Sequence, residues 1–137
     1  MRTLLDTDVI SQATKDRPNE RVLQWLDEQE EDDLFLSVAT LLEIRVGIEQ
    51  SDPGKKREKL ERWLVHSLPE RFYGRIVPIE RHAADLAGRM IVRSRHEGWQ
   101  MQPMDALIAA TAMVHDMALA TLNRKDFERL GVELVEF

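Results

Sequence analysis

The sequence predicts an α/β fold in which a short, mainly parallel sheet of four to five strands carries helices on both faces. Short apolar segments alternate with longer amphipathic segments along the 137 residues, which is typical of parallel strands connected by helices. No internal repeat, low-complexity tract or linker-like change of composition divides the chain. Because a chain of this length can build one full hydrophobic core, we expect a single domain over residues 1–137.

The first half of the chain contains recognisable helix boundaries. Pro18-Asn19 is typical of a helix start, Ser37 suits an N-cap, and the Ser-Asp-Pro-Gly segment at 51–54 breaks the chain. The expected elements are a strand over 2–5, a helix over 7–14, a helix that starts at Pro18-Asn19, a strand over 34–36, a helix after Ser37 and a long charged helix from Lys55 towards Leu68.

In the second half, proline and glycine again mark the boundaries. Pro78 ends a strand, Gly98 stops an amphipathic helix, and Pro103 takes the first position of the next helix, where its missing N–H costs nothing. That helix is apolar almost all round, so we expect it at the centre of the fold. The expected elements are a strand over 75–79, helices over 83–96 and 103–117, a strand over 118–122, a short helix over 125–130 and a last short strand over 133–135.

The composition indicates a cytoplasmic type of protein. The chain has no cysteine, which excludes disulfides, zinc–thiolate sites and a cysteine nucleophile. Asp6 comes too early for a signal-peptide core, and the longest apolar stretch, around 106–114, is too short to cross a bilayer. We therefore expect a cytoplasmic location and no membrane association.

The net charge of −6 argues against indiscriminate nucleic-acid binding, which normally needs a strongly basic surface. The basic residues nevertheless form two groups, one within 55–62 and one that contains Arg89, Arg93 and Arg95. Each group is explained by a solvated helix face with partners four residues away, such as Asp85 with Arg89. A local phosphate-binding strip is the alternative.

Four acidic residues occupy positions where a folded chain rarely places a charge. They are Asp6 at the end of the first strand, Glu43 within an apolar helix, Asp105 before an apolar run, and Asp126 just past the fourth strand. Carboxylates are costly to bury unless they are paired or bound to a cation. Ligands of parallel sheets bind outside the carboxyl ends of the strands, where we expect Asp6 and Asp126. If the fold gathers all four acids, a hard, oxygen-seeking metal ion is needed to offset their repulsion.

Two of these acids also have an adequate structural explanation. Asp6 could cap the helix that follows it, although Thr7 or Asp8 could do so instead and leave Asp6 free. Asp105 lies in the first turn of its helix, where the helix dipole stabilises a negative charge by about 0.3–1 kcal/mol. The same dipole would keep the carboxylate ionised and available to a cation.

Glu43 and the fourth position differ in how well structure alone explains them. The neighbours of Glu43 at three and four residues along its helix are all small or apolar, so it lacks the basic partner of a typical surface glutamate. Asp126 lies in a turn-like segment in which Asn123 competes for the same role, directly or through a water. The functional explanation is favoured for Glu43, and the fourth position is open between Asp126 and Asn123.

Other familiar catalytic patterns are missing from the sequence. The four histidines do not have metal-ligand spacing, and no Gly-rich phosphate loop, nucleophile elbow or Ser-His-Asp arrangement is visible. The acids therefore remain the candidates for chemistry.

Four segments together resemble the PIN-domain family, in particular the VapC/FitB-type toxins of bacterial toxin–antitoxin pairs. They are LLDTDVIS at 4–11, SVATLLEIRVG at 37–47, MDALIAATA at 104–112 and ATLNRKDF at 120–127. Any one of them is a weak signal. All four in family order, at family-like separations and over nearly the whole chain, are specific.

The resemblance implies a Rossmann-like PIN domain and an endoribonuclease that depends on Mg²⁺ or Mn²⁺. It also implies homodimerisation and inhibition by a small cognate antitoxin, with no direct DNA binding when the antitoxin is absent. By position, Asp6, Glu43 and Asp105 match the three most dependable acids of the family. All of them are expected to act as catalytic metal ligands.

Two positions depart from the family pattern. The fourth acid of relatives is found where Asn123 or where Asp126 stands here, so Asp126 is the expected fourth ligand and Asn123 the alternative. Asp8 stands where relatives mostly carry asparagine, and it could add charge to the site or cap the helix.

Three other functions share parts of this pattern. Asp6 and Asp8 nearly match the D-x-D-x-[T/V] signature of haloacid-dehalogenase-like phosphatases, but Ile10 departs from it and the other acids would have no role. A PIN-like module that binds RNA or protein without cleavage would have lost acids, whereas here only the fourth position is ambiguous. A receiver-like phosphoacceptor domain needs an acid at the end of the third strand, which instead ends in Pro78-Ile79. We therefore expect the metal-dependent ribonuclease.

Overall fold

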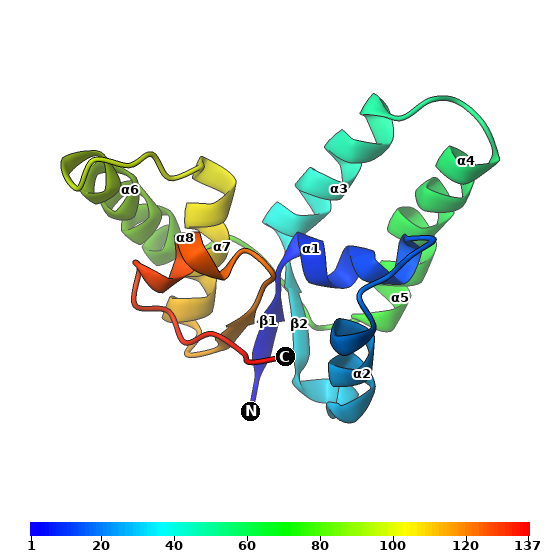
Figure 1. Cartoon of the computed structure of the whole chain (residues 1–137), viewed down its shortest axis with the longest axis horizontal. Helices are drawn as coiled ribbons and strands as arrows, with labels where there is room; N and C mark the ends of the chain where they lie inside the picture. The colour runs from blue at the N-terminus through cyan, green and yellow to red at the C-terminus, as the bar shows by residue number, and fades with distance from the viewer.

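The computed structural model describes residues 1–137 and shows a four-stranded parallel sheet with helices on both faces (Figure 1). The strands are β1 (Thr3–Leu5), β2 (Leu34–Ser37), β3 (Ile76–Val77) and β4 (Ala118–Ala120), in the spatial order β3-β2-β1-β4. All three pairings are parallel, so the carboxyl ends of the strands lie on one edge of the sheet. The expected α/β fold class is confirmed.

The helices begin where the sequence indicates. The side chain of Asn19 accepts the N–H groups of Arg21 and Val22, and that of Ser37 accepts the N–H of Thr40. The helical elements are α1 (Thr7–Ile10), the 3₁₀ helix η1 (Ser11–Thr14), α2 (Glu20–Glu28), the 3₁₀ helix η2 (Glu31–Asp33), α3 (Val38–Gln50), α4 (Lys55–Arg62), the π-helix η3 (Trp63–Ser67), α5 (Leu68–Arg71), α6 (Arg81–His96), α7 (Pro103–Val114) and α8 (Arg124–Glu128).

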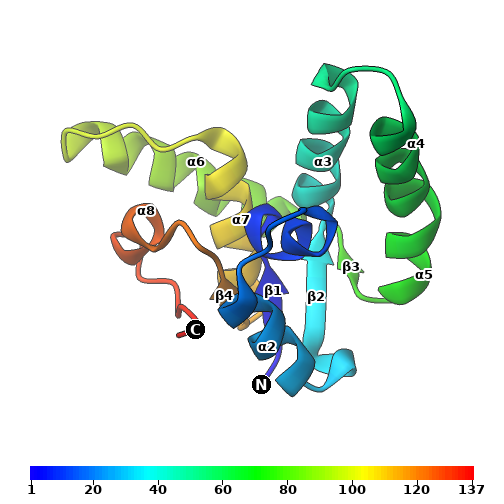
Figure 2. The same ribbon diagram turned by 45° about the vertical axis from the view of Figure 1, so that its right-hand side comes forward.

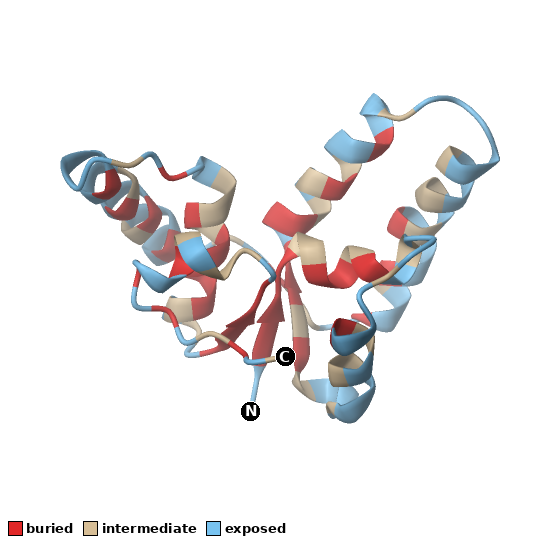
Figure 3. Ribbon diagram, in the orientation of Figure 1, coloured by how far each residue is buried: buried red, intermediate tan, exposed pale blue.

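Each face of the sheet has its own hydrophobic core. Leu4 and Leu5 are consecutive strand residues and therefore point to opposite faces. Leu4 packs into a core with side chains of α6, α7 and α8, whereas Leu5 packs into a second core with side chains of α1, α2, α3 and α5. Both leucines are fully buried, and Figure 3 shows the buried strands between the two helical layers.

Two groups of helices flank the sheet. Figures 1 and 2 show α6, α7 and α8 on one side, and α3 running alongside α4 on the other. Half of the residues of α7 are buried, in keeping with its apolar composition, and it packs against both α6 and α3. No helix combines the length and the apolar composition that a membrane span requires.

Four strands are shorter than expected, among them the first, which was expected over 2–5 and begins at Thr3. The third was expected over 75–79 but consists only of Ile76–Val77, because Pro78 has no N–H to continue the ladder. The fourth ends at Ala120 because Thr121 and the N–H of Leu122 turn to contact the start of α1. The last expected strand, over 133–135, is a single parallel bridge between Leu134 and Leu119.

Helix boundaries differ by one or two residues in α6 and α8, which were expected over 83–96 and 125–130, and they differ in kind or length at three other places. The segment expected over 7–14 changes from α-helix to the tighter 3₁₀ form at Ser11. The long charged helix widens into a π-turn just before Pro69, which lacks an N–H and would clash with the carbonyl four residues earlier. α7 ends at Val114 rather than at 117, because Asp116 adopts a positive φ of 55° that turns the chain into β4.

Candidate metal and active site

Asp6 lies where β1 ends and α1 begins, and only 5% of its surface is exposed. Its Oδ1 accepts the N–H of Thr7 at 2.8 Å, so Asp6 itself caps α1, and the alternative cap from Thr7 or Asp8 is wrong. Its Oδ2 accepts the hydroxyl of Thr121 at 2.7 Å. Because each carboxylate oxygen has two lone pairs, both oxygens retain one for a further ligand. Capping therefore leaves Asp6 free to take part in a site.

Glu43 lies near the middle of α3 and is half-buried. Its Oε1 accepts the hydroxyl of Thr7 at 2.5 Å, and that hydroxyl also lies 3.3 Å from the hydroxyl of Thr40. The partner of Glu43 is therefore a threonine of α1 rather than a basic residue, in agreement with its small and apolar helix neighbours. This contact holds the carboxylate beside the end of β1.

Asp105 lies in the first turn of α7, as expected, and is half-buried. Burial, and after it the charges of three other acids, raise its pKa from the ordinary value of 3.8 to about 6. The three acids are Glu43, Asp126 and Asp8. A charge shifts a pKa only from a short distance, so α3, α8 and α1 all bring an acid towards the N-terminus of α7.

Asp6 belongs to the same group of charges. Burial first, then the charge of Asp8 and to a smaller extent that of Asp105, raise the pKa of Asp6 from 3.8 to about 7, against hydrogen bonds that lower it. Burial also raises the pKa of Asp8, and the charge of Glu43 adds to this effect. Five carboxylates thus form what we call the acid cluster: Asp6, Asp8, Glu43, Asp105 and Asp126.

The two candidates for the fourth position contact each other. The side-chain amide of Asn123 donates to Oδ2 of Asp126 at 3.1 Å, and both residues are half-buried at the start of α8. The charge of Asp126 contributes to the raised pKa of Asp105, so the carboxylate of Asp126 lies on the side of α8 that faces α7. Asn123 therefore orients Asp126 in this arrangement.

The acid cluster contains only carboxylate oxygens, which are the ligands that Mg²⁺ and Mn²⁺ prefer. No group of three or more acidic or histidine side chains lies close enough together to enclose an ion directly. Mg²⁺ is usually held by one or two carboxylates and completes its shell with water. Burial and neighbouring acids raise the pKa of Asp6 and Asp105, and a bound cation would offset both effects. The cluster therefore fits an ion bound through few direct contacts.

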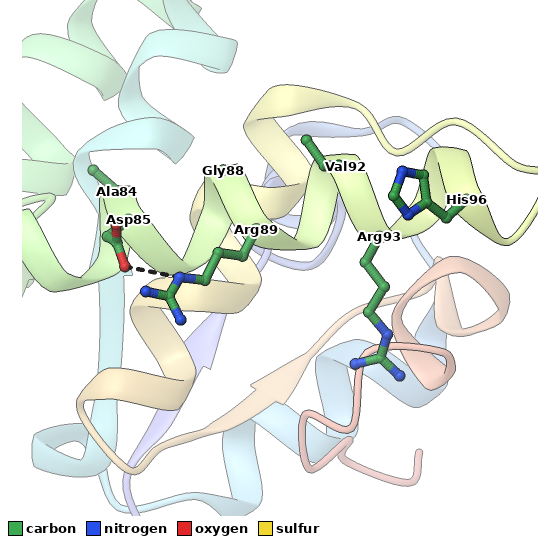
Figure 4. A pocket seen from close by; sticks show the side chains of 7 residues that line it. All are labelled: Ala84, Asp85, Gly88, Arg89, Val92, Arg93 and His96. Carbon is green, nitrogen blue, oxygen red and sulfur yellow. Dashed lines mark ion pairs between the residues drawn. The ribbon is translucent and has the colours of Figure 1, made fainter.

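Ion pairs occupy several of the grouped basic residues. Figure 4 shows a hollow along α6 in which Arg89 pairs with Asp85 at 3.2 Å. Arg93 of the same hollow pairs with Glu97 at 3.0 Å, and Arg57 of the other basic group pairs with an acid of α3. These pairs favour solvated helix faces over a phosphate-binding strip. None of the side chains that line the hollow belongs to the acid cluster.

Sequence reasoning missed the hydroxyl groups that hold the acids. Thr7 bonds to Glu43, and Thr121 bonds to Asp6. Both threonines lie directly after or next to the end of a buried strand, at the edge where ligands of parallel sheets bind. A polar residue at such a position is the signal that could have identified them.

The comparison with known sequences agrees with this geometry. The family model described as PIN domain matches residues 3–133. The chain is 36% identical over 124 residues to Toxin FitB of Neisseria gonorrhoeae, an alignment that covers 90% of this chain and 89% of that protein. It is 31% identical over 132 residues to VapC ribonuclease Y4jK of Sinorhizobium fredii, with 96% and 94% covered.

The fold agrees with a solved structure as well. The structure of FitAB bound to an IR36 DNA fragment matches with a TM-score of 0.88 at 34% identity, and the match covers 97% of this chain and 93% of that chain. Sequence and fold thus correspond over almost the full length. The chain therefore belongs to the PIN-domain family and is similar to its FitB and VapC members.

Proposed function

We propose that this protein is a metal-dependent endoribonuclease and the toxin of a type II toxin–antitoxin pair. The observation that carries the proposal is the acid cluster, whose carboxylates come from four separate segments and meet at the carboxyl edge of the sheet. Similarity to proteins named Toxin FitB and VapC ribonuclease supports it. The reaction is hydrolysis of an RNA phosphodiester bond by water.

In this proposal Asp6, Glu43, Asp105 and Asp126 hold the metal ion, few of them by direct contact and the others through its water ligands. When bound, Mg²⁺ or Mn²⁺ supplies acidified water and offsets the charge of the scissile phosphate. Asp6 and Asp105 are the main direct ligands in this proposal, because burial and neighbouring acids raise the pKa of each and a bound cation would offset both effects. Asn123 is the alternative at the fourth position, but its hydrogen bond to Asp126 favours an orienting role.

The threonines complete the site by orienting carboxylates. Thr121 holds one oxygen of Asp6, and Thr7 holds one oxygen of Glu43. Each hydrogen bond uses a single lone pair and restricts the rotation of the carboxylate. The remaining lone pairs then have fixed directions, which is the condition for binding an ion through few contacts.

The partners in this proposal are RNA, a small cognate antitoxin and a second copy of the chain, all in the cytoplasm. The FitAB structure that resembles this chain holds a DNA fragment. With a net charge of −6 this chain is poorly suited to bind DNA by itself, so we assign any DNA contact to the antitoxin. Light scattering after gel filtration tests the second copy: a mass of twice 15.9 kDa supports a homodimer, and 15.9 kDa at micromolar concentration contradicts it.

The nuclease itself is tested by incubating purified protein with total RNA and Mg²⁺ and mapping the new ends by sequencing. We expect cleavage at defined sites with wild-type protein and none with EDTA. Asp105→Asn should lower the rate of RNA cleavage by more than about 100-fold. Loss of a residue that only supports a metal ligand costs less than this. Full activity of this variant would overturn the assignment of the site.

A matched control separates the site from a general loss of negative charge. Asp85→Asn makes the same chemical change on α6, at an exposed carboxylate paired with Arg89. Its cleavage rate should equal that of the wild type. Thermal unfolding of both variants checks that the fold is intact.

The phosphatase and the non-cleaving module lack a specific observation in their favour. A phosphatase with Asp6 as its nucleophile would leave Asp105, whose charge raises the pKa of Asp6, without a role. Steady turnover of a chromogenic phosphate ester would support the phosphatase. RNA binding without cleavage, under conditions in which Mg²⁺ is bound, would support a PIN-like binding module that does not cleave.

A further inference from the structure

Asp8 connects two parts of the chain that lie far apart in sequence. It lies in the first turn of α1, and its two carboxylate oxygens lie 3.3 and 3.2 Å from the backbone nitrogen of Leu122, 114 residues later. Leu122 belongs to the loop between β4 and α8. The bond therefore joins the helix after the first strand to the loop after the last strand.

Neither capping nor ion pairing explains Asp8. The cap of α1 is Asp6, whose side chain accepts the N–H of Thr7. No ion pair in the structure includes Asp8; its carboxylate hydrogen-bonds to Leu122 instead. A carboxylate among like charges is costly, so the peptide N–H is the contact that accounts for its position.

The loop depends on hydrogen bonds for its position. The side chain of Leu122 is exposed, so packing does not hold this residue. On one side of it, Thr121 donates to Asp6 at 2.7 Å, and the N–H of Asn123 donates to the hydroxyl of Thr121 at 3.0 Å. With the bond to Asp8, three consecutive residues of the loop are fixed to the start of α1.

The same loop leads directly into the fourth position of the site. Asn123 ends it, and the side chain of Asn123 donates to Asp126 at 3.1 Å. A change in the loop therefore moves the group that orients Asp126. A continuous set of contacts runs from Asp8 through the loop to Asp126.

We propose that Asp8 is a positioning residue that fixes the loop over residues 121–123 and, through Asn123, the carboxylate of Asp126. Only the expected effect on cleavage rests on the proposed nuclease function. The hydrogen bond between Asp8 and Leu122 exists without substrate or metal. Because a peptide N–H needs an acceptor rather than a charge, the side-chain carbonyl of asparagine should replace the carboxylate of Asp8.

The test compares Asp8→Asn and Asp8→Ala with the wild type. In metal-free protein with EDTA, hydrogen exchange of the Leu122 amide is followed by NMR. Loss of a hydrogen bond to a charged acceptor should speed exchange in Asp8→Ala by at least about tenfold, whereas Asp8→Asn should stay within about threefold of the wild type. Exchange of the α6 amides should not change in either variant, which shows that the effect is local.

RNA cleavage gives the second measurement. Asp8→Ala should lower kcat by about tenfold with little change in KM, and Asp8→Asn should restore kcat to near the wild-type value. Asp85→Ala, an exposed change on α6, is the matched control and should be neutral. If the wild type and this control do not cleave RNA, the proposed nuclease fails while the exchange data still test the contact.

Two results would overturn the inference. One is unchanged exchange of Leu122 in Asp8→Ala. The other is a kcat of Asp8→Asn as low as that of Asp8→Ala, because the negative charge would then be what matters. If Asp8→Ala does not fold, Asp8→Asn decides alone: native exchange and native kcat support the inference, and loss of either rejects it.

Discussion

The hydroxyl of Thr121 donates a hydrogen bond of 2.7 Å to Oδ2 of Asp6, which lies 115 residues earlier in the chain. Asp6 directly follows β1 and Thr121 directly follows β4, its neighbour in the sheet. The same hydroxyl accepts the N–H of Asn123 at 3.0 Å. One threonine therefore fixes both the most buried carboxylate of the acid cluster and the loop that leads to α8.

Thr121→Val should destabilise the protein, because valine keeps the shape of the side chain but removes the donor to Asp6. We expect the free energy of unfolding to fall by about 1.5–3 kcal/mol, the range for hydrogen bonds to charged groups. Urea unfolding above about pH 7, where Asp6 is ionised, measures it. Thr111→Val is the matched control: it is equally buried, but its hydroxyl bonds only to a carbonyl of its own helix. Equal losses in both variants would contradict the role of Thr121.

The metal-free protein should lose stability as the pH rises from about 4 to about 7. Asp6 and Asp105 have pKa values of about 7 and about 6 in the folded state, against an ordinary 3.8. The folded state therefore binds more protons than the unfolded state in this range, and stability falls as they are released. For Asp6 the loss is at most about 4 kcal/mol. Thermal unfolding with EDTA should show a steeper decline for the wild type than for Asp6→Asn, and parallel curves would refute the assignment.

Millimolar Mg²⁺ should raise Tm more at about pH 8 than at about pH 5.5, because at the lower pH the ion competes with protons on Asp6 and Asp105. An ion at 100 times its Kd stabilises a folded protein by about 2.7 kcal/mol. NaCl at the same ionic strength controls for screening. An equal shift at both pH values, or an undiminished shift in Asp6→Asn, would place the ion elsewhere.

Glu43→Gln should stabilise the metal-free protein while abolishing cleavage. The glutamine oxygen can still accept the hydroxyl of Thr7, but the charge that raises the pKa of Asp105 is gone. We expect the free energy of unfolding, measured with EDTA, to rise by about 1 kcal/mol, which corresponds to somewhat less than one pKa unit. Glu49→Gln on the same helix, whose carboxylate is exposed and paired with Arg45 and Arg57, should leave cleavage unchanged. A cleaving Glu43→Gln would remove Glu43 from the proposed site.

Asp126→Asn should lower RNA cleavage more than Asn123→Ala. Asp126 supplies the carboxylate in the proposed site, whereas Asn123 only orients it through the 3.1 Å hydrogen bond. We expect a loss of more than about 100-fold for Asp126→Asn and of about tenfold for Asn123→Ala. Single-turnover rates with a short RNA that contains a mapped cleavage site measure both. The reverse order would assign the fourth position to Asn123.

Local signals were sufficient to predict most of the fold. Ser37 and Asn19 mark helix starts because a capping side chain acts on its own next few residues, and both caps are present. Strand lengths were less predictable, since Pro78 stops pairing earlier than the apolar pattern suggests. Residue 120 is the end of β4 because of contacts made by the next two residues with α1, and a local pattern does not contain such information.

The residues of the candidate site were also predictable only in part. The sequence singled out Asp6, Glu43 and Asp105 because each is a charge in apolar surroundings, and the structure brings them within electrostatic range. The roles of Asp8 and Thr121 depend on a pairing of β1 with β4 across more than a hundred residues. No spacing along the chain encodes that contact. The sequence therefore assigned no role to Thr121 and left Asp8 open between adding charge to the site and capping the helix.

The strand order has a consequence for the synthesis of the protein. β4 lies beside β1, although it is the last of the four strands to be made, and Asp126 follows it. A ribosome that has translated the first hundred residues has produced a chain with Asp6 and Glu43 but without Asp105, Thr121 or Asp126. The acid cluster can assemble only after residue 126 has been made. A chain that stops before residue 126 therefore lacks part of the proposed site.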